Sequence, residues 1–308
     1  MVLFLLFKRN WGLVCVSYIE YRSLDLGRDF FFTKYMVAIQ GIIGSFHHIA
    51  AMKLFTESVD IAPCLSFDDT VQCLLDGRSE SAIMALENSI AGSILPNYAL
   101  IDGNDLKITA ECYIDVQHNL LALNQQTIAD IKEVHSHPMA LLQCKTYLRQ
   151  YPHIKLVEAK DTADVARQIK EHQLKGIAAI ASKEAAAQFN LQILAEGIQT
   201  IKHNETRFVL VQSSKAIVFN DKYNKASLRF ELDHKRGSLA SILNVMSDCN
   251  LNLTKIQSLP KIETPWKYAF FVDVTFNRTE DYSKAIEIMT IMAENIRILG
   301  CYKNAKYD

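Results

Sequence analysis

The sequence predicts an α/β fold of two α/β lobes followed by a smaller unit that also mixes strands and helices. From Met36 onward, short apolar stretches alternate with helical segments that carry capping signals, which is typical of α/β architecture. After Gln212 the order changes to strand, helix, strand, strand, helix, strand. The chain has 308 residues, which is long enough for two or three domains.

The first 35 residues stand apart from this pattern. They begin with an apolar run that ends at Phe7, which is too short to span a bilayer. No charged stretch precedes the run and no small-residue cleavage pattern follows it, so a signal peptide is not expected. We interpret residues 1–35 as a non-native or unstructured extension before a start at Met36, with a membrane-tethering or packing helix as the alternative.

The first lobe alternates strands and helices whose ends carry local signals. A tight loop at 41–44 precedes its first helix, and Ser66-Phe67-Asp68-Asp69 is typical of a capping box that begins its second helix. The predicted strands cover 37–39 and 82–86, and the predicted helices cover about 45–55 and 67–77.

The second lobe spans about 106–191 and repeats this alternation. Pro138 stands at the first position of a helix, where its missing N–H costs nothing, and Asp161-Thr162 caps the helix that runs through His172. The chain then returns through 198–201 and 208–211, so we expect a cleft between the lobes, and such clefts favour small-ligand sites. Strands are predicted at 120–123, from 131, at 154–157 and at 177–181, with a last helix from Ser182.

A polar linker over 214–225 separates the lobes from a compact unit over 226–304. The order β-α-β-β-α-β in this unit is the ferredoxin-like arrangement. Its predicted strands cover 227–232, 251–256, 268–274 and 297–302, and its predicted helices cover 238–249 and 282–295.

Composition excludes several classes of function. The net charge is −1, so nothing global indicates binding to nucleic acid or to an anionic membrane. The seven cysteines form no Cys-x-x-Cys pair, which argues against a zinc site and a disulfide framework and favours a reducing cytoplasm. The sequence also has no phosphate-binding glycine loop and no credible metal cluster, so we expect neither a cofactor nor a metal.

Polar residues gather where the strand at 208–211 begins, in the segment His203-Asn204-Glu205-Thr206-Arg207-Phe208. A strand start can aim such side chains into a cleft. The segment offers a hydroxyl donor, a fixed cation for a carboxylate and an aromatic wall.

This segment belongs to a set that occurs in a family order and at family spacing: Gly41–His47, Leu86–Gly92, Ser136–Pro138 with Gln143-Cys144, Asp161–Ala163, Ala179–Ser182 and Asn204–Phe208. From Met36 to the C-terminus the chain resembles a monofunctional prephenate dehydratase with a C-terminal ACT domain. The resemblance implies a two-lobed, periplasmic-binding-protein-like catalytic domain over 36–213 and an ACT regulatory domain over 226–304. In the first segment Ile42-Ile43 stands where the family has Pro-Glu, and Ser45-Phe46-His47 replaces Thr-Phe-Ser.

The resemblance implies a carbon–oxygen lyase that converts prephenate to phenylpyruvate in phenylalanine biosynthesis. This reaction loses CO₂ and the ring hydroxyl, and the resulting aromatic ring makes it favourable. The alternatives are an arogenate dehydratase, which performs the same chemistry on the transaminated substrate, and a non-catalytic amino-acid-sensing protein.

The implied catalytic residues are Thr206, Asn88 and Ser89. We expect Thr206 to hydrogen-bond the departing hydroxyl and help to protonate it, which requires a preorganised, drier site. Asn88 and Ser89 are expected to donate to substrate oxygens, at a strand end where backbone N–H groups help to bind an anion.

The implied substrate-binding residues are Ser45, Glu87, Asn204, Arg207 and Phe208. Arg207 is expected to pair with a substrate carboxylate or, alternatively, to form a structural ion pair. Phe208 forms a wall of the ring site or packs in the core, and Glu87 orients other groups rather than acting as a base. Ser45 binds a carboxylate or simply caps its helix.

Regulation is expected from the C-terminal unit. Gly237-Ser238-Leu239-Ala240 is similar to the family's Gly-Ala-Leu segment, at a helix N-terminus that suits an amino-acid carboxylate. The family's second loop, Glu-Ser-Arg-Pro, is replaced here by Gln257-Ser258-Leu259-Pro260. The resemblance implies feedback by L-phenylalanine at Gly237, Ser238, Leu239, Gln257 and Ser258, and a homodimer or homotetramer.

Overall fold

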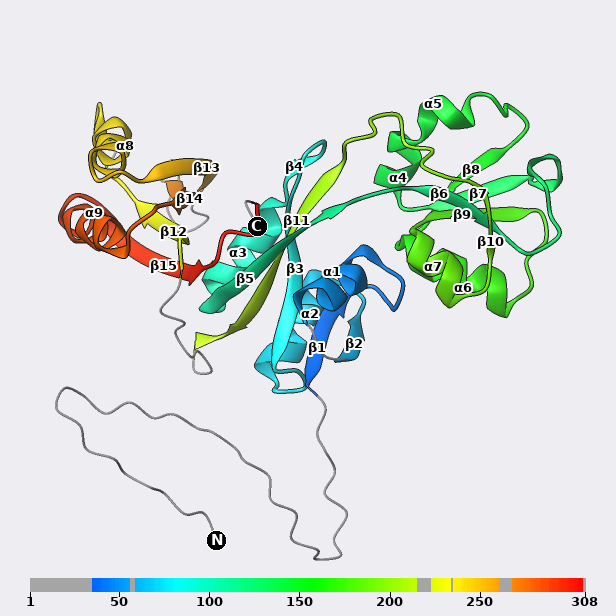
Figure 1. Ribbon diagram of the computed structural model, residues 1–308, viewed down its shortest axis with the longest axis horizontal. Coiled ribbons are helices and arrows are strands. Elements are labelled where there is room, and N and C mark those ends of the chain that lie inside the picture. The colour runs from blue at the N-terminus through cyan, green and yellow to red at the C-terminus, as the bar shows by residue number, and fades with distance from the viewer. Residues whose placement is uncertain (1–34, 56–58, 215–222, 234, 261–267, 307–308) are drawn as a thin grey trace, which may run out of the picture. The chain divides into compact units, whose positions relative to one another are not determined.

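The computed structural model describes residues 35–55, 59–214, 223–233, 235–260 and 268–306 (Figure 1). Within these ranges the chain forms three β-sheets with helices packed on them, which is an α/β fold with mixed sheets. No helix in these ranges is long and apolar enough to cross a membrane. The predictions for residues 1–34 and for most of the linker lie outside the described residues.

The first sheet has the strand order β2-β1-β3-β11-β5, with β4 paired to β3. Strands β1 and β2 and strands β1 and β3 are parallel, whereas β11 runs antiparallel to both β3 and β5. The strands are β1 (Met36–Gln40), β2 (Asp60–Cys64), β3 (Ser81–Asn88), β4 (Gly92–Ser93), β5 (Leu106–Asp115) and β11 (Glu205–Ser213). Strand β2 was not predicted because it contains Pro63, which only an edge strand tolerates.

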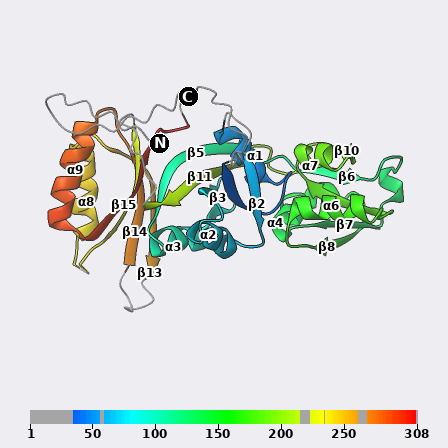
Figure 2. The same ribbon diagram turned by 90° about the horizontal axis from the view of Figure 1, so that it is seen from below.

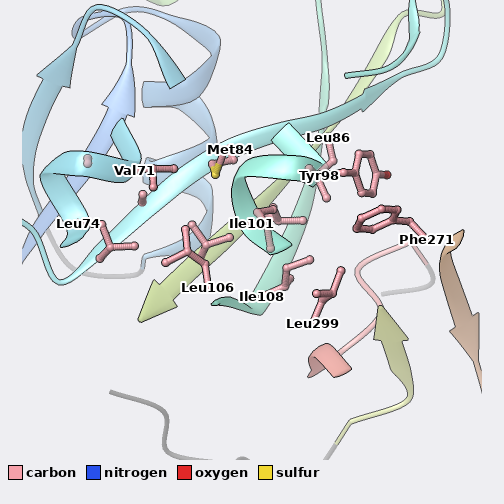
Figure 3. Packing of buried hydrophobic residues seen from close by; sticks show 14 of the residues in the cluster. Val71, Leu74, Met84, Leu86, Tyr98, Ile101, Leu106, Ile108, Phe271 and Leu299 are labelled. Carbon is pink, nitrogen blue, oxygen red and sulfur yellow. The ribbon is translucent and has the colours of Figure 1, made fainter. Parts of the chain in front are cut away.

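Helices cover both faces of this sheet because its strands are apolar on both sides. Val37 and Ile39 pack with α1 (Phe46–Leu54), whereas Ala38 faces α2 (Phe67–Leu75) and α3 (Leu95–Gly103). Figure 3 shows the second of these cores, in which Val71 and Leu74 of α2 and Ile101 of α3 pack around Met84 and Leu106.

The second sheet has the order β10-β6-β9-β7-β8. One core lies under α4 (Pro138–Gln143) and α5 (Lys145–Leu148), and another lies under α6 (Thr162–Glu171) and α7 (Lys183–Gln188). Its strands are β6 (Asn119–Ala122), β7 (Glu133–Ser136), β8 (Lys155–Glu158), β9 (Ile177–Ala181) and β10 (Gln192–Ala195). The strand predicted from 131 begins at 133, because a 3₁₀ turn, η1 (Ile128–Asp130), ends at Ile131.

The third sheet is antiparallel with the order β13-β14-β12-β15. Both helices of this unit pack on one face of it (Figure 2). The elements are β12 (Lys225–Glu231), α8 (Ser238–Asp248), β13 (Asn252–Pro260), β14 (Tyr268–Thr275), α9 (Thr279–Met292) and β15 (Glu294–Tyr302).

Two boundaries in this unit differ from the sequence prediction. The last helix was predicted to continue to Asn295, but it ends at Met292, because Ala293 is extended and Asn295 has a left-handed φ of +48°. Residues Gln257–Pro260 were treated as a loop, but they belong to β13 and pair with β14. The alternating exposure along β13 is that of an edge strand with one covered face.

The C-terminal unit packs directly on the first sheet. Phe271 and Leu299 belong to the same apolar cluster as Tyr98 and Ile108 (Figure 3). The rings of Tyr98 and Phe271 meet edge to face with centroids 5.5 Å apart. Strand β15 approaches β5 so closely that a Cβ atom on Gly300 would lie 2.1 Å from the carbonyl oxygen of Ile108.

Candidate active site

The predicted catalytic segments meet where the chain passes between the first two sheets. Strand β3 ends at Asn88, and β11 begins beside it with Thr206 directly opposite Asn88. The second lobe is inserted between β5 and β11. The chain enters this lobe at Val116 and leaves it at Asn204, and the N–H of Val116 donates to the carbonyl of Asn204 at 2.6 Å. The structure therefore brings together two segments that are more than a hundred positions apart in sequence.

Asn88 organises this junction through both ends of its amide. Its Oδ1 atom accepts from the N–H groups of Ile90 and Ala91 at 3.0 and 2.8 Å. These backbone donors fix the orientation of the amide, which places Nδ2 2.8 Å from Thr206 Oγ1 and 2.7 Å from Asn204 Oδ1. Asn88 was expected to donate to substrate, but in this structure it donates to protein groups and so orients Thr206.

Thr206 is left with a free hydroxyl hydrogen. Its oxygen accepts from Asn88, and among the described residues its hydroxyl donates to no acceptor. Because one lone pair of the oxygen accepts from the Asn88 amide, the O–H bond is not directed at Asn88 and is available to a ligand. The side chain is 7% exposed, so water competes weakly for this hydrogen.

The network continues from Asn204, which was expected to bind substrate, to Gln143 and His118 of the second lobe, for which the sequence prediction assigned no role. Fully buried Asn204 donates through Nδ2 to Gln143 Oε1 at 3.1 Å, and that same oxygen lies 2.9 Å from Nε2 of His118. Gln143 lies in a segment that carries the family resemblance, which was the available signal. His118 follows β5 in an irregular connection, and no pattern in the sequence distinguished it.

Ser89 and Glu87 are engaged on the opposite side of the strand pair. Ser89 exchanges two hydrogen bonds with the backbone of Glu205, at 2.8 and 2.9 Å. Glu87 accepts from Lys255 of β13 at 2.7 Å. Both line a cavity of about 360 Å³ between β3, β11 and the C-terminal unit. Their predicted substrate roles are therefore not matched by contacts with the Asn88–Thr206 pair.

Arg207 forms the structural ion pairs that were the alternative to a substrate carboxylate. Its guanidinium contacts Asp273 of β14, Nε donates to Glu111 at 2.7 Å, and Nη2 donates to the Tyr302 hydroxyl at 2.7 Å. Burial disfavours both charges, but their mutual attraction outweighs it, so the pKa of Arg207 is raised and the pKa of Asp273 is lowered. No donor of Arg207 is directed to a ligand beside Thr206.

Phe208 and Ser45 also adopt the structural alternatives. Phe208 is 2% exposed and packs in the core under α1, where the His47 ring meets it edge to face at 5.0 Å. Ser45 caps α1 by accepting from the N–H of His48 at 3.3 Å. Burial lowers the pKa of His47 to about 4, and its Nε2 atom has no hydrogen-bond partner among the described residues.

The glycine loop before α1 reaches the second lobe. The Ser182 hydroxyl at the start of α7 donates to the carbonyl of Gly44 at 2.6 Å. A Cβ atom on Gly41 would lie 2.9 Å from a carboxylate oxygen of Asp161. Asp161 caps α6 as predicted, and burial raises its pKa. The first lobe therefore contacts the second at two helix N-termini.

The predicted effector residues lie in the C-terminal unit. Gly237 begins α8 with φ +86° and is followed by Ser238, whose hydroxyl donates to the carbonyl of Lys235. Gln257 and Ser258 lie in β13. Across the described part of the chain, no group of three or more histidine, cysteine or acidic side chains is arranged to hold a metal ion.

The chain was compared with known families, proteins and structures. Residues 37–216 match the family model "Prephenate dehydratase". The chain is 36% identical to the prephenate dehydratase of Methanocaldococcus jannaschii, over 82% of this chain and 92% of that protein. It is 33% identical to the chloroplastic arogenate dehydratase/prephenate dehydratase 1 of Arabidopsis thaliana, over 88% of this chain and 72% of that protein.

A solved structure gives the same result. The prephenate dehydratase of Arthrobacter aurescens in complex with L-Phe superposes with a TM-score of 0.79 at 25% identity, covering 89% of this chain and 91% of that chain. The match to prephenate dehydratases, together with the α/β fold with mixed sheets, places the chain in the hydro-lyase class of enzymes. The chain belongs to the prephenate dehydratase family.

Proposed function

We propose that the chain converts prephenate to phenylpyruvate, CO₂ and water, and that Thr206 is its proton donor. The observation that carries this proposal is the Asn88–Thr206 hydrogen bond, which leaves one hydroxyl hydrogen directed away from the protein network. The C–CO₂⁻ bond breaks, its electron pair completes the aromatic ring, and the ring hydroxyl departs. Thr206 hydrogen-bonds that oxygen and passes it the hydroxyl proton, so the oxygen leaves as water, and a proton from solvent restores Thr206 before the next turnover.

One substrate carboxylate is proposed to lie at the N-terminus of α1. Ser45 marks this end of the helix, and the unpaired N–H groups of a first turn attract an anion. Asp161 and Ser182 approach the preceding loop from the second lobe, which closes the site on that side. These contacts support a ligand site between the two lobes, in a periplasmic-binding-protein-like arrangement.

Replacing Thr206 tests the proposed proton donor. Thr206→Ala removes the hydroxyl, and we expect kcat to fall by about 100-fold or more, the usual contribution of a positioned acid. Thr206→Ser retains the hydroxyl and should keep kcat within about tenfold, so it is the matched control. Ultraviolet detection of phenylpyruvate from prephenate measures both, and near-normal turnover by the alanine variant would contradict the assignment.

The same assay with arogenate decides between the two substrates. Relatives carry both activities in their names, and the two reactions share the departing groups. We propose prephenate as the better substrate because the relative that matches over 92% of its own length is a prephenate dehydratase. A higher kcat/KM for arogenate would instead make the chain an arogenate dehydratase.

We also propose that the C-terminal unit is a ferredoxin-like ACT domain that binds L-phenylalanine. Its β-α-β-β-α-β order and the L-Phe complex of the Arthrobacter protein support this proposal. The proposed contacts are Gly237, Ser238, Leu239, Gln257 and Ser258, in a homodimer or homotetramer. Calorimetric titration without binding, together with full activity in millimolar phenylalanine, would contradict it.

A further inference from the structure

We propose that His118 is a positioning residue of this site: its ring holds Gln143, which acts through Asn204 and Asn88 to aim the Thr206 hydroxyl. The inference rests on the proposed function, because its consequence is a loss of turnover. His118 itself contacts neither Thr206 nor Asn88 through any hydrogen bond between described residues.

The donor and acceptor of each hydrogen bond in this network follow from the backbone groups at its Asn88 end. The N–H groups of Ile90 and Ala91 can only donate, so Asn88 presents its amide hydrogens to Thr206 and Asn204. Asn204 therefore accepts through Oδ1 and donates through Nδ2. Gln143 accepts this bond on Oε1. The orientation of each amide therefore determines the orientation of the next amide in the network.

This series of hydrogen bonds determines which nitrogen of the His118 ring carries the proton. Gln143 Oε1 can only accept, so the contact of 2.9 Å requires a hydrogen on Nε2 of His118. Burial lowers the pKa of His118, and its Nδ1 atom has no hydrogen-bond partner among the described residues. The ring is therefore neutral, with its hydrogen on the nitrogen that faces Gln143.

The surroundings of His118 hold the ring in place. Its N–H donates to Gln199 Oε1 at 3.0 Å, and its carbonyl accepts from the N–H of Ile198 at 2.8 Å. The ring meets Phe46 edge to face, with centroids 5.8 Å apart. The residue is 4% exposed. These contacts make His118 the fixed end of the network.

Gln143 depends on this fixed end. Its amide group has a second rotamer in which nitrogen and oxygen are exchanged, and that rotamer would present N–H groups to both Asn204 Nδ2 and His118 Nε2. Two donors facing each other are unfavourable, so the ring and Asn204 together select the observed orientation. Without the ring donor, Gln143 is held by Asn204 alone, so the positions of Asn204 and of the Asn88 amide that contacts Thr206 are less tightly restrained.

His118→Leu removes the ring donor, and we expect kcat for prephenate to fall by roughly tenfold to hundredfold with KM changed less than about threefold. His118→Gln carries an amide N–H with similar reach and should recover most of that loss. Asn97→Leu is the matched control, because it removes a buried side-chain hydrogen bond to the carbonyl of Ala85 without contacting the network. It should lower the melting temperature but keep kcat within about threefold.

The double variant His118→Leu/Gln143→Leu completes the design. If His118 acts through Gln143, the double variant will have the kcat of Gln143→Leu alone. Multiplicative losses, equal losses in Asn97→Leu and His118→Leu, or no recovery in His118→Gln would each overturn the inference. A wild-type protein inactive on both prephenate and arogenate would overturn the proposed function and this inference together, whereas an active wild type with an active His118→Leu variant overturns this inference alone.

Discussion

Thr206 and Arg207 are neighbours in the chain, but their side chains enter different surroundings. Thr206 joins the amide network at the junction of the lobes, whereas Arg207 points to the C-terminal unit and pairs with Asp273. Successive side chains of a strand point to opposite faces, and this alternation separates the two roles. A motif of adjacent residues in a strand therefore serves two sites.

His47 makes the stability of the protein depend on pH. Its ordinary pKa of 6.5 falls to about 4 in the folded protein, so between these values the unfolded chain binds the additional proton. We expect stability to decrease as the pH falls from 6.5 to 4. His47→Phe keeps a ring against Phe67 and Phe208. Its melting temperature should fall by fewer degrees over this pH range than that of the wild type.

The control for this prediction is His153→Phe, which changes an exposed histidine. Thermal unfolding of the three proteins at pH 6.5 and at pH 4.5 gives the comparison. If His47→Phe and the wild type lose the same number of degrees, the buried imidazole is not the source of the acid sensitivity.

Helix beginnings are the elements that the sequence predicted best. Ser66 and Asp161 cap helices as predicted, Ser182 caps the helix that was predicted to begin there, and Ser45 adopts its capping alternative. A cap is decided by a side chain and a backbone N–H only three residues away. Strand β2 was missed, since its proline is acceptable only at a sheet edge, and edge position is a property of the whole sheet.

The loop before α1 is an element whose shape the second lobe restricts. Gly44 has φ +91°, and a Cβ atom there would lie 3.0 Å from the Cα atom of Ala185 in α7. Gly77 has φ +71°, and a Cβ atom there would meet nothing within 4 Å. A substitution at Gly77 would therefore cause backbone strain but no steric clash. We expect Gly77→Ala to cost about 1 kcal/mol of unfolding free energy and Gly44→Ala to cost clearly more.

Activity separates these two variants further. Gly44→Ala should also lower kcat/KM by about tenfold or more, because displacing α7 moves one side of the proposed site. Urea unfolding and the phenylpyruvate assay measure the two effects. Equal kcat/KM values for both variants would show that the contact between the loop and α7 is not needed for catalysis.

At the scale of the whole molecule, the attachment of the C-terminal unit could not be predicted from the sequence. The buried charges that join it to the first sheet come from distant positions: Asp273 is 66 residues from Arg207, and Lys225 is 114 residues from Glu111. Each is ordinary in its own segment, and only the assembled fold shows that they pair. The motif around Thr206 predicted that a strand begins there but not the partners of its arginine.

Gly300 tests this attachment without changing a charge. A Cβ atom there would lie 2.1 Å from a backbone oxygen of β5, so Gly300→Ala forces the two units apart. We expect a loss of about 3 kcal/mol or more in unfolding free energy, at the upper end for overpacking. Gly103→Ala is the matched control, because a Cβ atom at Gly103 meets nothing within 4 Å. Similar urea midpoints for the two variants would contradict the close approach of β15 to β5.

The position of β11 has a consequence for how the protein is made. This strand lies between β3 and β5 in the first sheet, yet the whole inserted lobe precedes it in the chain. During synthesis β5 leaves the ribosome without a neighbour in this sheet and waits while the inserted lobe is translated. The inserted lobe can therefore fold on its own first, and the first sheet closes only when β11 arrives to join its two halves.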